Sequence, residues 1–150
     1  MDAPTDIAQI AHSIQLSLAP VFLLSGIVQL LGVLTNRLAR AVDRARTLEE
    51  QHRLATHEDA PDLAYQLQLL AKRARLLNGA ITLGTLSALV IALIVALLFA
   101  SAFIRFTLAL PVAALFVAAM LALVIGLICF LVEVRVATFA LRIGPRDPAP

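Results

Sequence analysis

Three long stretches of the chain contain no Asp, Glu, Lys or Arg, and they constrain the fold more than any other feature of the sequence. They run from Ile7 to Asn36, from Leu76 to Ile104 and from Phe106 to Val132. A helix needs about 20 apolar residues to cross a bilayer, and each stretch exceeds that length. A soluble domain of 150 residues could not bury three helices that are apolar on every side. We therefore predict an all-α integral membrane protein with three transmembrane helices.

The composition agrees, because 61% of the residues are hydrophobic and 15% are charged, against about 45–50% and about 25% in soluble domains. We expect a single membrane domain over residues 1–150, with a bend at Pro20 between its first two segments. The expected segments are an interfacial amphipathic helix (1–17), the first span (18–35), a helical hairpin (36–77), the second span (78–101), the third span (108–132) and a cytoplasmic tail (133–150).

Two apolar stripes predict that residues 36–77 form an antiparallel helical hairpin. The motif HEDAPD breaks the helical pattern between them, and Pro61 suits the first turn of the second helix. Steps of three and four residues are typical of a coiled-coil seam. The first stripe is Leu31, Leu34, Leu38, Ala41, Ala45, Leu48, His52 and Ala55, and the second is Leu63, Leu67, Leu70, Ala74, Leu77 and Ile81.

The distribution of basic residues predicts the orientation. Eight of the twelve Lys and Arg residues lie between the first and second spans, three follow the third span, and Arg105 alone lies in the other connection. Basic residues near span ends stay on the cytoplasmic side. We expect the N-terminus outside, and the hairpin and C-terminus in the cytoplasm. The first span lacks the basic start of a cleaved signal peptide.

The charges within the hairpin predict contact with anionic lipid headgroups. Residues 37–46 and residues 72–75 each carry a net charge of +3, whereas the tip at 49–62 carries −4. Basic residues beside the membrane attract anionic headgroups, while nucleic-acid binding would need them at the exposed end. Around Asp43, ordinary helical ion pairs and a recognition motif both remain open. The lipid-facing or ion-paired set is Arg37, Arg40, Asp43, Arg44, Arg46, Lys72, Arg73 and Arg75.

Small residues recur at every fourth position in the second and third spans. Such spacing allows close approach of membrane helices, either within one chain or between two copies. The sequence leaves both possibilities open. The second span carries Ala80, Gly84, Ala88, Ala92, Ala96 and Ala100, and the third carries Ala114, Ala118, Ala122 and Gly126.

Four polar residues mark a layer near the cytoplasmic end of the predicted bundle: Gln29, Asn36, Asn78 and Glu133. Polar groups that face a membrane bundle are paired or functional. Glu133 either pairs with Arg37, Arg40 or Arg75, or contributes to a site for a small ligand, an ion or a proton. One carboxylate is too few for a metal site, and no cofactor is expected. The single Cys129 is expected only to pack.

The chain resembles a family of small bacterial membrane proteins known as domain of unknown function 2721. The resemblance rests on IQLSLAPVFLLSGIVQLLGVLTNRLARAVDRARTLE, on KRARLLNGAITLGTLSALV and, more weakly, on FLVEVRVA. Its most specific part is the R-L-A-R-x-x-D-R-x-R block from Arg37 to Arg46. The resemblance implies a three-span membrane protein of bacterial origin, which we expect in the inner membrane, and it brings no established activity.

Two functions follow as hypotheses. The first is a structural or interaction protein whose hairpin docks a partner protein or a second copy of the chain. The alternative is a small oligomeric transporter or channel subunit with the polar layer lining a path. An enzyme is not expected, because the sequence shows no nucleophile–base pair, ligand cluster or Gly-rich phosphate loop.

Overall fold

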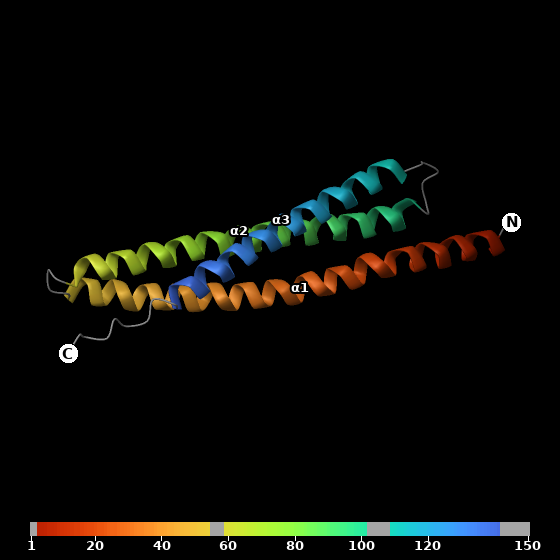
Figure 1. Cartoon of the computed structure of the whole chain (residues 1–150). Coiled ribbons are helices and arrows are strands. Elements are labelled where there is room, and N and C mark those ends of the chain that lie inside the picture. The colour runs from red at the N-terminus through yellow and green to blue at the C-terminus, as the bar shows by residue number, and fades with distance from the viewer. Residues whose placement is uncertain (1–2, 55–58, 102–108, 142–150) are drawn as a thin grey trace. The chain divides into compact units, whose positions relative to one another are not determined.

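A computed structural model of the chain describes residues 3–54, 59–101 and 109–141. These residues form three helices: α1 (Ala3–Leu54), α2 (Ala60–Ser101) and α3 (Ala109–Leu141) (Figure 1). Pro61 and Pro111 lie in the first turns of α2 and α3, where a missing backbone N–H costs nothing. The all-helical prediction is confirmed for the described residues. The expected connection around Arg105, the hairpin tip at 55–58 and the tail after residue 141 lie outside them.

Each helix contains a segment that is long and apolar enough to cross a membrane, by length and composition. The segments are Leu18–Leu54, Ala60–Ala100 and Leu110–Thr138. Only 17%, 22% and 11% of their most apolar windows are buried within the chain. A water-soluble core helix would bury most of such a window, so this exposure is typical of helices that lie in a membrane. The prediction of three membrane-type helices is confirmed.

The predicted bend at Pro20 falls within a continuous helix, because α1 runs through 52 residues with Pro20 inside it. Proline removes one backbone hydrogen bond and crowds the carbonyl four residues earlier. In apolar helices, neighbouring helices and local adjustment offset this loss. Pro20 is buried, which places it against such a neighbour. The expected interfacial helix and the first span therefore belong to one continuous helix.

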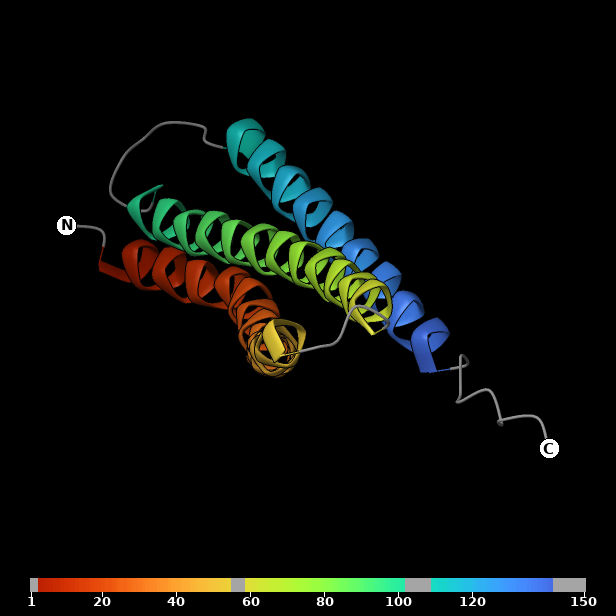
Figure 2. The same cartoon turned by 90° about the vertical axis from the view of Figure 1, so that its left-hand side faces the viewer.

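The chain forms two compact units, which are described separately. The first unit comprises Met1–Gly32 and Thr82–Ile125. In both views of this unit α2 lies beside α1 and α3 (Figures 1 and 2). Its core is a cluster of Ile27 from α1, Ile91 from α2, and Ala119 and Leu123 from α3.

Two close contacts reinforce the core of the first unit. The buried Ser87 hydroxyl donates to the backbone carbonyl of Ala119 over 2.8 Å, which links α2 to α3. Gly84 is buried against α1, and a Cβ placed there would lie 3.1 Å from Cδ2 of Leu31. Only a glycine allows α2 and α1 to approach this closely without displacing that leucine.

The second unit comprises Val33–Ile81 and Gly126–Pro150. Here α1 and α2 run in opposite directions side by side, because Leu48 lies near Tyr65 and Arg37 near Arg73. The buried apolar residues recur in steps of seven along α1, and in steps of seven and three along α2, as expected for a heptad pattern. They are Leu34, Ala41 and Leu48 on α1, and Leu70, Leu77 and Ala80 on α2.

Candidate functional site

Glu133 is the centre of the most distinctive polar site in the second unit. Its side chain, on α3, is completely buried. Oε1 accepts hydrogen bonds from Nε and Nη2 of Arg73, at 3.0 and 2.9 Å. Nη2 of Arg37 lies 3.5 Å from Oε2. Since Arg37 belongs to α1 and Arg73 to α2, one carboxylate connects all three helices of this unit.

Arg37 makes a second contact with α3. Its guanidinium carbon lies 5.3 Å from the centre of the Phe130 ring, within the range of a cation–π interaction. Phe130 precedes Glu133 by three residues, so both side chains lie on one face of α3. The aromatic ring and the carboxylate together hold the Arg37 side chain toward α3.

The two oxygens of Glu133 differ in their surroundings. Oε1 has two hydrogen bonds, whereas Oε2 is buried and has no hydrogen-bond partner among the described residues. Its contact with Arg37 is an ion pair rather than a hydrogen bond of ordinary length. A buried carboxylate is stable only when it is paired. Arg73 is therefore the principal partner of Glu133, and Arg37 the secondary one.

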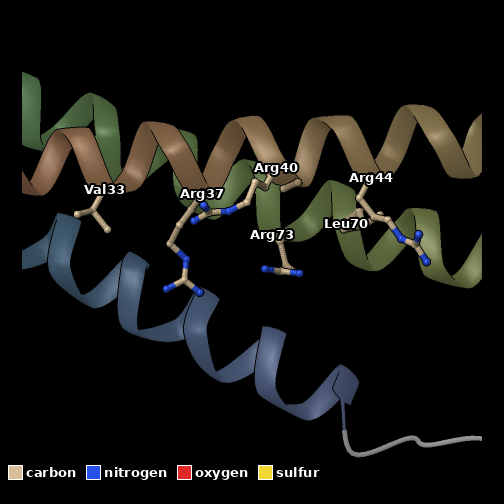
Figure 3. A pocket seen from close by; sticks show the side chains of 7 residues that line it. Val33, Arg37, Arg40, Arg44, Leu70 and Arg73 are labelled. Carbon is tan, nitrogen blue, oxygen red and sulfur yellow. The ribbon is translucent and has the colours of Figure 1, made fainter.

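Four arginines of the second unit line one pocket of about 340 Å³ (Figure 3). Arg37, Arg40 and Arg44 come from successive turns of α1, and Arg73 comes from α2. Val33, Ala41 and Leu70 also line it, and none of its described lining residues is acidic. We call this the arginine pocket. Its composition suits a multivalent anion.

A second pocket in this unit, of about 650 Å³, has a more apolar lining. Leu48, Leu69, Leu70 and Ala137 contribute aliphatic surface, and Tyr65 contributes a side chain that is 53% exposed. Asp62 and Gln66 also line it, together with Arg37, Arg44 and Arg73, which it shares with the arginine pocket. We call it the tyrosine pocket. All three helices contribute to it.

Residues 17–143 match the family described as Protein of unknown function (DUF2721). The chain belongs to DUF2721. The match includes every helix of the site and both pockets. Neither a curated protein nor a solved structure matches the chain. The family confirms the resemblance expected from the sequence and supplies no activity.

In this DUF2721 chain, the predicted polar layer does not form one buried cluster. Glu133 is buried, whereas Asn36 and Asn78 of the same unit are exposed, although Asn78 has an interaction partner. Gln29 belongs to the first unit and is exposed there. Arg37 was expected as a partner of Glu133. Arg40 and Arg75 were the other predicted partners, but the principal partner is Arg73, which we predicted to contact lipid headgroups or to form ion pairs.

The heptad spacing of α2 could have indicated that Arg73 lies on the inward face of the helix. Arg73 precedes the buried residues Ala80, Ser87 and Ile94 by successive steps of seven. The same spacing connects Ala119, Gly126 and Glu133 on α3. Both members of the pair therefore lie on the inward faces of their helices.

The other four residues of the predicted charged set are not among the residues that line the arginine pocket. Arg46 lines a separate cavity of about 500 Å³ together with Glu49. Lys72, Arg75 and Asp43 are exposed, and Asp43 accepts a hydrogen bond from Thr47 through its backbone carbonyl. Four of the eight predicted residues thus line the arginine pocket, and the other four do not.

The predicted small-residue stripes follow the packed faces only in part. Gly84 and Gly126 are buried, and Ala88 and Ala122 are half-buried. Ala92, Ala96 and Ala118 are exposed. Four residues turn a helix by about 400°, so a strict four-residue repeat drifts by about 40° per step and leaves the contact face. The exposed members are free to contact lipid or another protein.

Proposed function

We propose that this chain is a membrane-anchored interaction protein. Its apolar helices hold the antiparallel pair formed by residues 36–77, and this pair docks a protein segment. The excess of Lys and Arg between the first two spans supports a cytoplasmic position for the pair. The same proposal places the N-terminus outside and the C-terminus in the cytoplasm of a bacterial cell.

The observation that carries the proposal is the tyrosine pocket. Its volume of about 650 Å³ falls within the range of binding sites, about 300–1,000 Å³. Tyr65 is an exposed aromatic residue above aliphatic surface, and tyrosines of this kind contribute strongly to protein interfaces. The ion pairs of Glu133 fix α3 against the helical pair, so the pocket is held in shape before a partner arrives.

The internal use of the two heptad seams limits where a partner can bind. Leu34, Ala41, Leu48, Leu70 and Leu77 are buried within a single chain. These side chains are not available to form a coiled coil with a second copy. A partner or a second copy would therefore bind at the tyrosine pocket or at the exposed small-residue faces, rather than along the seams.

The transporter alternative has less support. It requires Gln29, Asn36, Asn78 and Glu133 to line a common path, yet Glu133 is buried and committed to two arginines. An enzymatic role is not proposed, because the sequence provides no nucleophile–base pair.

Photo-crosslinking in native membranes tests the proposal. A photoreactive residue at Gln66, which lines the tyrosine pocket, is expected to form a discrete protein adduct. Tyr65→Ala should remove most of this adduct. The same probe at Gln51, an exposed residue outside the pocket lining, is the control. Equal adducts from both positions, or an adduct at Gln66 that survives Tyr65→Ala, would contradict docking at this pocket.

A further inference from the structure

The arginine pocket concentrates more positive charge than its surroundings compensate. Arg37, Arg40, Arg44 and Arg73 supply four cations. Glu133 supplies one negative charge, through its contacts with Arg37 and Arg73. Neither Arg40 nor Arg44 forms an ion pair in the described part of the chain. The four arginines and Glu133 together carry a net charge of +3, and Asp62 lines the adjoining tyrosine pocket, so the arginine pocket remains a region that attracts anions.

The geometry of the guanidinium groups favours a phosphate over a carboxylate. A guanidinium has five N–H donors, and the bonds to Glu133 engage Nε and Nη2 of Arg73. Arg40 and Arg44 are exposed and retain their donors. In Figure 3 the side chain of Arg40 extends toward Arg37, the side chain of Arg37 extends toward α3, and Arg44 points in the opposite direction from Arg40. Arginines that line one pocket can together donate hydrogen bonds to the several oxygens of a phosphate.

The sequence position of the pocket indicates which phosphates can reach it. Arg37 is the first charged residue after the apolar stretch that ends at Asn36. Val33 and Leu70 supply an apolar border to the pocket. Basic pockets at such a depth bind phospholipid headgroups. A soluble phosphorylated compound presents the same chemistry from the aqueous side.

We propose that the arginine pocket is a phosphate-binding site, occupied by an anionic phospholipid headgroup or by a soluble phosphorylated ligand. The site is local: it uses these four arginines and excludes Arg46, Lys72 and Arg75. Glu133 has a positioning role, since it orients Arg37 and Arg73 without contacting the phosphate. The phosphate proposal does not rest on the docking proposal, although the two pockets share Arg37, Arg44 and Arg73.

Two titrations of the full chain in detergent test this proposal. One uses dispersed phosphatidylglycerol, and the other uses sodium phosphate against sodium chloride at equal ionic strength. Bound lipid is counted by native mass spectrometry, and bound phosphate is measured by calorimetry. Saturable binding in the lipid arm assigns the pocket to a headgroup, and saturable binding in the phosphate arm assigns it to a soluble phosphate. Either result supports the site.

Two matched double variants distinguish a specific phosphate site from nonspecific attraction of anions to a basic surface. Arg40→Gln/Arg44→Gln should raise the Kd by about tenfold or more in the arm that saturates, because two charge-assisted contacts are lost. Arg46→Gln/Arg75→Gln removes the same charge outside the pocket and should change the Kd by less than about twofold. All four side chains are exposed, so both variants should fold. Tyr65→Ala should leave phosphate binding unchanged, which separates this site from the docking proposal.

Two results would overturn the proposal. In one, neither titration saturates with the unaltered chain. In the other, the two double variants lose affinity equally, which is the behaviour of a diffuse basic surface.

Discussion

Glu133 sits in surroundings that would be unfavourable for a carboxylate without its two arginine neighbours. Its side chain is fully buried, while those of Arg37 and Arg73 are 29% and 24% exposed. Burying a charge costs several kcal/mol, and a close partner with good geometry offsets that cost. Arg73 provides this geometry through two donors on one oxygen. Arg37 adds a longer ion pair and its contact with Phe130.

Truncating Arg73 should therefore destabilise the chain more than truncating Arg37. Arg73→Ala leaves the buried carboxylate without its hydrogen bonds, and we expect a loss of about 3 kcal/mol in the free energy of unfolding. Arg37→Ala should cost about 1 kcal/mol, because Oε1 keeps both bonds. The measurement is equilibrium unfolding in detergent, with the exposed Arg75→Ala as a control expected to change stability by less than about 0.5 kcal/mol. Equal losses for Arg73→Ala and Arg75→Ala would refute this role for the pair.

At the scale of the helices, a seven-residue spacing selects the packed faces. It places Ile27, Leu34, Ala41 and Leu48 on the buried face of α1, and it was recognisable in the sequence because apolar and small residues recur there. Arg73 and Glu133 occupy positions of the same seven-residue spacing. Because they are charged, they do not match the apolar pattern by which such positions are recognised in a sequence. Their pairing depends on how α2 and α3 are placed in the second unit, which composition does not encode. The helices could therefore be predicted from the sequence. The principal partner of Glu133, and which arginines line the arginine pocket, could not.

Gly84 provides a test of close helix approach in the first unit. Gly84→Leu should destabilise the chain by about 1–3 kcal/mol, because even a Cβ would lie 3.1 Å from Cδ2 of Leu31. Gly26 is the matched control, since nothing lies within 4 Å of a Cβ placed there. Gly26→Leu should be neutral or stabilising by up to about 1 kcal/mol, because leucine favours helix over glycine. Thermal unfolding in detergent compares the two, and similar midpoints would argue against tight packing at Gly84.

For the whole molecule, the lengths of the helices indicate which residues can lie within a bilayer. α1 has 52 residues, which corresponds to about 78 Å at the α-helical rise. The hydrocarbon core of a bilayer is about 30 Å thick. α2, with 42 residues, also exceeds it. We therefore expect the charged parts of both helices, residues 37–53 of α1 and 62–75 of α2, to lie outside the hydrocarbon. The proposed docking and phosphate sites both belong to these charged parts.

The side of the membrane on which this helical pair lies is the central claim, and cysteine accessibility tests it directly. Thr5→Cys and Glu50→Cys, each made in a Cys129→Ala background, would be treated in intact cells with a maleimide that cannot cross the inner membrane. We expect the cysteine at position 5 to be labelled at once, and the one at position 50 only after permeabilisation. Labelling at position 50 in intact cells, with position 5 protected, would contradict the proposed orientation.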